Sequence, residues 1–559
     1  MPSSKGQETP MTFKKIWNDL LSDKILFFAL MAIVLARLIN AFVLAPIQDE
    51  MYYFYWARFL DWGYFDHPPL VAWSSILGTL FPSSAFAARS GTVLMGLISI
   101  PLLASLFREV GLKDRAPFAG AMLLSAGSLV GVLFGYLTTP DIPMIFCWIA
   151  ALHECAKALS NQPKRWLSAG LFTGLGILGK YTMVLIGPVF LLALLFHPKK
   201  LKSPWPYLGG LVCVLVILPH VYWLKQNEWI TTRFQFGRGL MSQYGVEMQK
   251  GHDLPSAQAA LDSGEEARLA RFFILPEDKK KESTPKPTGM VKAWRGFWDY
   301  TGGQLAIWGL LLIPIIYGLY RGRKRKNFQG IRWTWTSPAH GALIMSAGLF
   351  PVLIFFPLSL VQHVEANWPA MYCIGASAIL VRYARISRRL MVIAVIGNLA
   401  LTLLISWHTA SPLRFTAPEK DRLLRETHGY KDLAAVLEEL PPAPMFADTY
   451  QNVSAVAFYA PTLKIQQWPG IARTSEIQRR KAMNPWQWQN IKEEGGFFLL
   501  MDNFVPPFIP GATIDSLTEI LDCPGRGVIL TKANLGGLYE RPCNDRVHRW
   551  SLAYYSTAE

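Results

Sequence analysis

Long apolar runs constrain the fold of this 559-residue chain more than any other feature. Several of them reach about 18 to 22 residues, the length that an α-helix needs to cross the hydrocarbon core of a bilayer. Charged residues make up 17% of the chain, whereas soluble domains contain about 25%. The sequence therefore predicts a polytopic α-helical membrane protein rather than a large soluble one.

Eleven apolar stretches are predicted to be membrane helices, and 141–156 and 166–179 are the shortest of them. Residues 1–24 are polar and are predicted to form a cytoplasmic leader, and 70–82 is a candidate interfacial or re-entrant element. The predicted helices lie near 25–45, 90–107, 117–137, 141–156, 166–179, 181–197, 205–223, 303–320, 340–361, 366–381 and 390–408. The count is about 11 to 13, because boundaries read from sequence shift by several residues.

Lysine and arginine clusters in the short loops orient these helices. With eleven spans, six such clusters fall on one side, which the positive-inside rule makes cytoplasmic. This clustering also accounts for the formal charge of +16, and no basic domain of the kind that binds nucleic acid is present. Loops 46–89 and 224–302 and the tail 409–559 are then extracytoplasmic. The tail is predicted to be a soluble α/β domain, and 276–292 is a Lys- and Pro-rich loop.

Ionisable side chains gather on this extracytoplasmic face, where clustered charges are costly unless they serve a purpose. The carboxylates are Asp49, Glu50, Asp66, Asp141 and Glu365, and the bases are His67, His363, Lys180, Arg233, Arg238 and Arg295. A carboxylate can act as a general base or bind a divalent cation, and Lys or Arg can bind phosphate oxygens. Asp141 could instead only cap a helix, and the rings of 52–62 could form an interfacial belt. The glycines of "GLGILGK" (174–180) are interpreted as helix-packing positions.

Several motifs resemble those of the polyprenyl-phosphate-sugar-dependent membrane glycosyltransferases. "QDE-MYYFYWARFL" followed by "GYFDHPPL" is similar to the first extracytoplasmic loop of this GT-C superfamily. The superfamily includes the protein O-mannosyltransferases and the bacterial aminoarabinose transferase of lipid A. "TPD", "LGKYT" and "ANWPA" follow in the expected order, so the resemblance covers about residues 25 to 408.

The resemblance implies a role for individual residues of this chain. Asp49 would be the acid–base residue at the acceptor hydroxyl and Asp141 a second essential acid. Asp66 would be the metal-associated carboxylate; the relatives have Lys where this chain has His67, which could bind a metal or a phosphate. Members of the family differ in metal dependence, so a divalent cation is a candidate cofactor. The substrate-binding residues would be Glu50, Tyr53, Tyr64, His67, Lys180, Arg233, Arg238, Glu365 and Asn367.

These features predict an inverting glycosyltransferase in the bacterial inner membrane, acting on the periplasmic face as a monomer. Its donor would be a polyprenyl-monophosphate sugar, and its acceptor lipid A or another envelope glycolipid. A protein O-glycosyltransferase is the alternative within the family. A lipid-linked glycan flippase is a rival from another class, although no internal repeat of the transporter type is visible, and a scaffold that displays the tail is a third. Whether Cys523 and Cys543 pair remains open at this stage.

Overall fold

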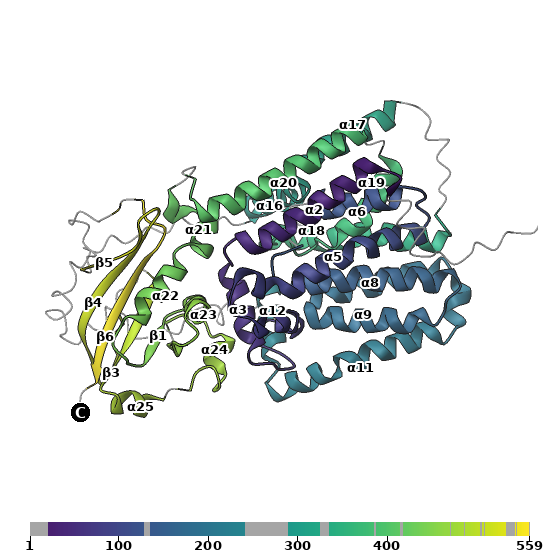
Figure 1. The fold of residues 1–559 in the computed structure, drawn as a ribbon. Helices are drawn as coiled ribbons and strands as arrows, with labels where there is room; N and C mark the ends of the chain where they lie inside the picture. Colours follow the sequence, from purple (N-terminus) through teal and green to yellow (C-terminus); the bar gives the residue numbers. More distant parts are fainter. Residues whose placement is uncertain are drawn as a thin grey trace, which may run out of the picture.

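A computed structural model of the chain shows a bundle of long helices joined to a smaller domain that contains a β-sheet (Figure 1). The structure describes residues 21–127, 135–240, 289–324, 335–384, 387–413, 417–469, 471–485, 487–502, 506–507, 509–532, 543 and 545–557. The predicted leader 1–24, the loop 276–292 and the middle of 224–302 fall wholly or mostly outside these residues.

The bundle is built from helices that match the predicted apolar runs. Each of the eleven predicted ranges overlaps a helix or a helical run in the described residues. The helices are α2 (Lys24–Val43), α5 (Ala85–Glu109), α6 (Ala116–Gly127), α8 (Asp141–Ser160), α9 (Arg165–Gly179), α10 (Ile186–Leu195), α11 (Trp205–Gln226), α16 (Gly289–Trp308), α17 (Leu312–Lys324), α18 (Pro338–Val361), α19 (Tyr372–Tyr383) and α20 (Arg388–Ala410). Among the described residues, seven helical segments are by themselves long and apolar enough to span a membrane. The predicted polytopic helical class is confirmed.

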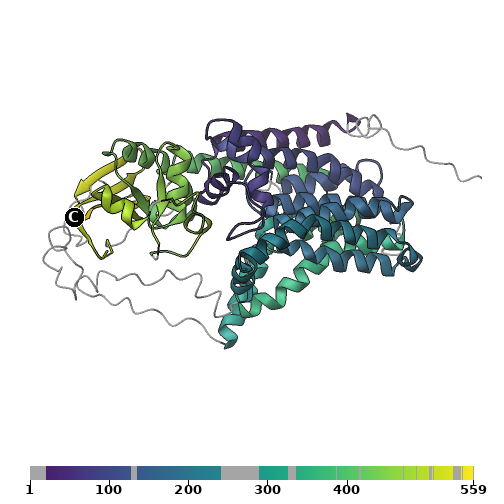
Figure 2. The ribbon, with the colours of Figure 1, turned by 90° about the horizontal axis from the view of Figure 1, so that it is seen from below.

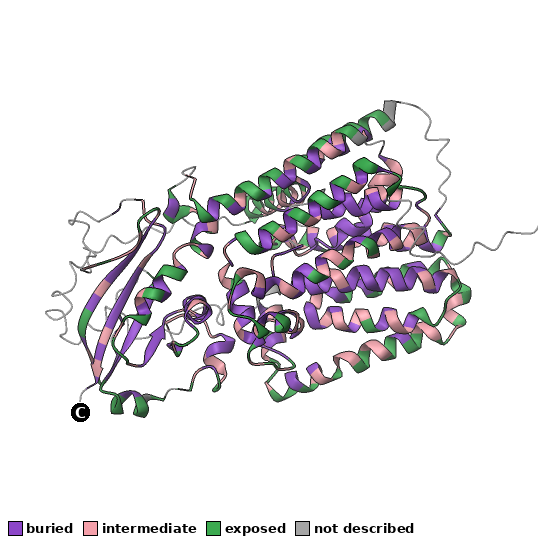
Figure 3. Ribbon diagram, in the orientation of Figure 1, coloured by how far each residue is buried: buried purple, intermediate pink, exposed green. Residues whose placement is uncertain are grey.

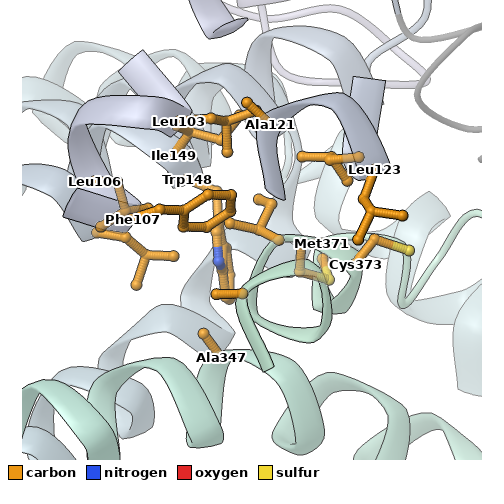
Figure 4. Packing of buried hydrophobic residues seen from close by; sticks show 14 of the residues in the cluster. Leu103, Leu106, Phe107, Ala121, Leu123, Trp148, Ile149, Ala347, Met371 and Cys373 are labelled. Carbon is orange, nitrogen blue, oxygen red and sulfur yellow. The ribbon is translucent and has the colours of Figure 1, made fainter. Parts of the chain in front are cut away.

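The middle of the bundle is tightly packed around α8. Trp148 of α8 is fully buried and lies among Leu106 and Phe107 of α5, with Ala347 of α18 below it (Figure 4). The most apolar part of α8 is 83% buried, against 22% for α11. Figure 3 shows this difference in burial: the outer helices carry exposed residues along their length. Exposed apolar residues on an outer helix are what a lipid-facing surface requires.

Small residues allow α9 and α11 to approach closely. A Cβ atom on Gly170 would lie 1.9 Å from the carbonyl oxygen of Gly209, and one on Gly174 would lie 2.8 Å from the Cβ of Val216. Both distances are shorter than a real Cβ atom makes to a neighbouring atom, so a larger residue at either position would push the two helices apart. The interpretation of the "GLGILGK" glycines as helix-packing positions is confirmed at Gly174.

The C-terminal domain is built on a mixed sheet of six strands in the order β2-β1-β3-β6-β4-β5. The first three strands are parallel, and the others pair antiparallel. The strands are β1 (Met445–Ala447), β2 (Ile465–Gln467), β3 (Gly496–Asp502), β4 (Ala512–Cys523), β5 (Gly527–Lys532) and β6 (Arg549–Thr557). The helices are α21 (Arg422–Thr427), α22 (Tyr430–Glu438), α23 (Tyr450–Tyr459), α24 (Glu476–Arg479) and α25 (Trp488–Glu493). Cys523 and Cys543 form a disulfide, which answers the question left open above.

This domain packs against one end of the bundle, as both ribbon views show (Figures 1 and 2). Its nearest neighbour there is α3 (Gln48–Ala57), which lies in the unusual loop 46–73 together with α4 (Leu70–Ser74). The ring of Tyr52 lies 4.4 Å from that of Tyr450, and Phe54 lies 5.4 Å from Phe458. These rings belong to one buried hydrophobic cluster that includes both segments. Loop 46–73 is therefore a core element between the two parts of the protein rather than a free surface loop.

Candidate active site

The first turn of α3 places two adjacent carboxylates in different environments. Asp49 is exposed, whereas Glu50 is completely buried. Helical geometry explains the split, because consecutive residues point about 100° apart. Both lie in the first turn, where the positive end of the helix dipole stabilises an anion. Only Asp49 is therefore open to a substrate.

Glu50 is held inside the fold, and its predicted role in substrate binding stays a prediction. Arg89 of α5 donates from Nε to Glu50 Oε1 at 2.8 Å, and the backbone N–H of Thr138 donates to the same oxygen at 2.8 Å. The other carboxylate oxygen accepts from the backbone N–H of Ile47 at 3.2 Å and also contacts Arg89. With both oxygens bound and no exposed surface, Glu50 has no remaining contact to offer a substrate.

Tyr64 is also held inside the fold, and its predicted role in substrate binding stays a prediction. It is fully buried, its ring stacks on Trp56 at 4.4 Å, and its hydroxyl donates to the carbonyl oxygen of Phe59 at 3.2 Å. Tyr53 is also buried, at 5% exposure, and lies edge-on to the ring of His67 at 6.0 Å. Tyr53 and Tyr64 are therefore packed inside the protein rather than lining an open pocket.

Asp141 joins three segments that are far apart in the sequence. It is the first residue of α8, and Pro140 is the N-cap, so the helix-cap interpretation is wrong. Lys180 Nζ donates to one oxygen of Asp141 at 2.8 Å, and Asn367 Nδ2 donates to the other at 3.0 Å. Asp141 is 3% exposed. The structure thus brings three predicted site residues into direct contact.

Glu365 and Asp49 both influence a residue of the C-terminal domain. Arg422 of α21 has a raised pKa, first because of its hydrogen bond and ion pair with Glu426 and then because of the charges of Glu365 and Asp49. Glu365 lies two residues before Asn367, which binds Asp141. The carboxylates of α3 and of the 363–369 loop therefore act on the same arginine.

Asp66 forms an ion pair with the C-terminal domain. Its Oδ1 lies 2.7 Å from Arg473 Nη1, at an angle that makes the contact an ion pair rather than a linear hydrogen bond. The hydroxyl of Tyr52 donates to Oδ2 at 2.8 Å and accepts from the backbone N–H of Glu476 at 2.9 Å. Asp66 is 4% exposed. A buried carboxylate of the first loop is thus neutralised from the other domain.

The predicted metal pair of Asp66 and His67 does not fit a metal centre in this arrangement. Nδ1 of His67 lies 3.2 Å from Nε2 of Gln235, and Asp66 is paired with Arg473. Within the described ranges, no group of three or more His, Cys, Asp or Glu side chains is close enough to hold an ion. Because Zn²⁺ and Mg²⁺ sites need several such ligands or bound waters, no step below is assigned to a metal.

The remaining predicted basic residues are not held by buried contacts of the kind that hold Lys180. Arg233 of α12 (Ile230–Leu240) and Arg295 of α16 are exposed, and His363 lies 3.4 Å from Glu365 on the surface. The side chain of Arg238 is outside the described residues. Lys180 is therefore the predicted base whose place in the site the structure fixes.

Sequence reasoning missed the contribution of the C-terminal domain. Arg422, Tyr450 and Arg473 all reach the first loop, and the nearest of them in sequence is more than 300 positions from α3. Burial raises the pKa of Tyr450, Asp49 raises it further, and Arg473 lowers it. No local motif marks these residues, because each sits in an ordinary loop or helix end. Only the docked fold reveals that they belong to the site.

Comparison with known proteins gives this geometry a context. Residues 66–223 match the family model described as dolichyl-phosphate-mannose-protein mannosyltransferase. A lipid A galacturonosyltransferase, RgtD, from Rhizobium johnstonii is 26% identical over 218 residues, which is 38% of this chain and 45% of the relative. An undecaprenyl phosphate-alpha-4-amino-4-deoxy-L-arabinose arabinosyl transferase from Pseudomonas fluorescens is 24% identical over 282 residues, or 48% of each chain.

The solved structure of ArnT from Cupriavidus metallidurans bound to undecaprenyl phosphate superposes with a TM-score of 0.42 at 15% identity, over 86% of this chain and 92% of that one. The chain spans less than half of the length of the curated relatives it matches. The family match and the named relatives confirm the resemblance to polyprenyl-phosphate-sugar-dependent glycosyltransferases of the GT-C superfamily that the motifs of loop 46–73 predicted.

Proposed function

We propose that this protein transfers a sugar from a polyprenyl-monophosphate carrier to a hydroxyl of an envelope glycolipid, with lipid A as the first candidate acceptor. The observation that carries the proposal is a group of polar side chains at one end of a membrane bundle. Lys180 and Asn367 both bind Asp141, and Arg422 of the C-terminal domain lies within the electrostatic influence of Glu365 and of the exposed Asp49. A lipid-linked donor and an acceptor could meet at such a surface without leaving the membrane.

Asp49 is the residue best placed to act as the general base. It is exposed and lies at the N-terminus of a short helix, where its anionic form is favoured. In the proposed step it takes the proton of the acceptor hydroxyl, whose oxygen attacks the anomeric carbon. The bond from that carbon to the carrier phosphate breaks on the opposite face, and its electron pair leaves with the phosphate. The configuration is inverted.

Lys180 is proposed to hold the phosphate of the donor. Its ammonium group has three N–H donors, and one is used by Asp141 at 2.8 Å. The remaining donors can bind phosphate oxygens as negative charge develops on them in the transition state. Asp141 and Asn367 fix the position of Lys180, so the charge is oriented before the donor arrives.

The acceptor and the location follow from the relatives and the charge pattern. By their names, one of the relatives described above acts on lipid A, and the other is a transferase that uses an undecaprenyl-phosphate-linked sugar. We extend this chemistry to the present chain and place it in the bacterial inner membrane with the site on the periplasmic face, since the Lys and Arg clusters face the other way. We keep the monomer as the working assembly.

The proposal is tested by the lipid A mass spectrum of a deletion strain, complemented with wild-type protein or with Asp49→Asn. Deletion should remove one sugar from lipid A, wild type should restore it, and the variant should not, although it is inserted normally. Purified protein should also release free polyprenyl phosphate only when donor and acceptor are both present. An unchanged spectrum in the deletion strain rejects the lipid A acceptor, and sugar on proteins instead would identify the alternative acceptor class.

A further inference from the structure

We propose that Arg473 of the C-terminal domain supplies the fixed positive charge beside Asp66, at the place that the sequence pattern assigns to a divalent cation. The inference rests on the proposed function in that Asp66 belongs to the same site as Asp49. It goes beyond that function because it makes the C-terminal domain part of the site and predicts that transfer needs no metal at Asp66.

The contact has the features of a built site rather than of a surface ion pair. Arg473 Nη1 lies 2.7 Å from Asp66 Oδ1, and the side chains are 20% and 6% exposed. Exposed ion pairs contribute little, but removal of one partner from a buried pair leaves an uncompensated charge. Tyr52 holds the second oxygen of Asp66 from below at 2.8 Å. The carboxylate is thus fixed on both sides.

Aromatic rings hold the guanidinium group in place. Its central carbon lies 4.4 Å from the ring centre of Tyr450 in α23 and 5.1 Å from that of Phe234 in α12. Both distances are within the range of a cation–π contact. Arg473 therefore joins three parts of the chain: the first loop, the segment after α11 and the C-terminal domain. A guanidinium held by two rings and a carboxylate is a permanent cation of the site.

The same contacts leave no suitable place for a metal ion. An ion bound to Asp66 would have to displace or face the positive charge of Arg473 at close range. The neighbouring His67 has its Nδ1 turned toward Gln235, at 3.2 Å. Tyr52 occupies the second oxygen of Asp66, and the described residues contain no group of three or more His, Cys, Asp or Glu side chains that could hold an ion.

Tyr53 and Tyr450 feel the charges of Arg473 and of the proposed base together. Burial raises the pKa of both Tyr53 and Tyr450; the charges of Asp49 and Asp66 raise it further, and Arg473 lowers it. The two rings therefore lie within the field of both carboxylates and of the arginine. Arg473 acts through Asp66 and Tyr450, so it is a positioning residue rather than a catalytic one. Docking of the C-terminal domain brings it into place.

The test uses the full-length protein in detergent and compares Arg473→Met, Asp66→Asn and the double variant D66N/R473M. The matched control is Arg480→Met, because Arg480 also ties the domain to the first loop, through Phe59 at 2.8 Å and Asp61 at 3.4 Å, but leaves Asp66 paired. The readouts are metal content by mass spectrometry, thermal unfolding with and without EDTA, Mg²⁺, Mn²⁺ or Zn²⁺, and the transfer rate.

We expect wild-type protein to hold no stoichiometric metal and to keep its rate in EDTA. Arg473→Met should lower the rate about 100-fold, the size typical of removing one fixed charge from a site, and Arg480→Met much less. The double variant should regain thermal stability relative to the single ones, because no buried charge is left unpaired, but not the rate. A double variant that regains both shows that the pair only holds the domains together and overturns the proposal.

The metal measurements also separate this inference from the proposed function. They need neither donor nor acceptor, so they decide the role of Arg473 even if no transfer is found. One equivalent of metal in wild-type protein that is lost in Asp66→Asn overturns the inference and leaves the glycosyltransferase proposal standing. Stabilisation by divalent cations that appears in Arg473→Met but is absent in wild type supports it.

Discussion

Buried carboxylates occur at both ends of the helical bundle, and Glu154 at one end differs from Asp66 and Asp141 at the other in how far along the chain its partners lie. At the end away from the C-terminal domain, Glu154 contacts His153, Arg165 and Ser168 at 2.9, 3.0 and 2.5 Å, and none of them is more than 14 positions away. The direct partners of Glu154 lie on one helix hairpin, α8 and α9, although His153 also contacts Ser105 of α5 at 2.9 Å. A local network of this kind is sufficient to explain a buried charge by the fold alone.

The end against the C-terminal domain is organised differently. Asp141 binds Lys180, 39 positions away, and Asp66 binds Arg473, which belongs to another domain. Asp49 precedes both of them in the chain and remains exposed. Long-range pairs cost more chain entropy to bring together than local ones. A partner from a second domain, near one exposed carboxylate, therefore distinguishes the candidate active site from a structural network, although both contain the same residue types.

The adjacent acids of α3 offer the largest test of this distinction. We expect Glu50→Ala to destabilise the protein by about 3–5 kcal/mol, because it leaves the buried Arg89 unpaired. Asp49→Asn should cost little stability and lower the transfer rate about 10²–10⁴-fold, the usual contribution of a general base. Thermal unfolding and rate per folded molecule separate the two. If Asp49→Asn unfolds the protein, or Glu50→Ala is stable but inactive, the assignments must be exchanged.

A buried acid in the C-terminal domain, Asp448, provides a second test, because its hydrogen bonds come from an amide side chain and a backbone N–H rather than from arginine or lysine. Asp448 follows β1 and accepts from Asn452 at 3.0 Å and from the backbone N–H of Asp502 at 2.8 Å. Burial raises its pKa from 3.8 to about 6. The folded state therefore holds a proton more tightly than the unfolded state, and the contribution of Asp448 to stability is full below about pH 4 and is lost as the pH rises through 6.

Asp448→Asn removes this titration. The stability of the variant relative to wild type should rise between pH 4 and pH 7, by at most about 3 kcal/mol for a shift of this size. Apparent melting temperatures of both proteins across that pH range measure the difference. A difference that is flat would show that burial does not shift the pKa of Asp448, and one that falls as the pH rises would show that Asp448 is stabilised as an anion.

The sequence was sufficient to predict the membrane helices, because hydrophobicity over 20 residues is a local property. It also predicted that Asp141, Lys180 and Asn367 share one face, since helix ends and loop orientation follow from the charge pattern. The sequence did not predict which of two adjacent side chains on a helix is buried. Nothing local distinguishes Asp49 from Glu50, and only the position of Arg89 on the neighbouring helix decides which is buried.

The docking of the tail was not predictable for a related reason. Arg473 and Tyr450 lie in the tail that the sequence predicts to be a separate domain. The residues next to them in the sequence do not indicate that they contact the first loop. The aromatic residues of that loop carried a partial signal. Tyr52 was compatible with a membrane belt, but it packs in the interface between the domains. Interfaces between domains depend on complementary surfaces, which a single sequence does not reveal.

Lys180 tests the convergent end directly. We expect Lys180→Met to raise the KM for the lipid-linked donor about tenfold or more, because a charge-assisted contact to phosphate is lost. The acceptor KM should change less. Lys180→Arg keeps the charge and should restore part of the donor affinity, although its geometry differs. Steady-state rates with varied donor give the answer. Equal loss in both variants with an unchanged KM would indicate that Lys180 only supports Asp141.

Glu154 provides the smallest expected effect and the strictest check of the comparison. Glu154→Gln keeps a hydrogen-bond acceptor for Ser168 and removes a charge from a pair in which Arg165 is 45% exposed, so the loss of stability should be about 1 kcal/mol or less. Along α8, Glu154 lies about 20 Å from Asp141, too far to contact the same substrate group. The transfer rate per folded molecule should equal that of wild type. A rate loss like that of Lys180→Met, at normal stability, would mean that a local network at the far end also serves the reaction, and that long-range pairing alone does not identify the site.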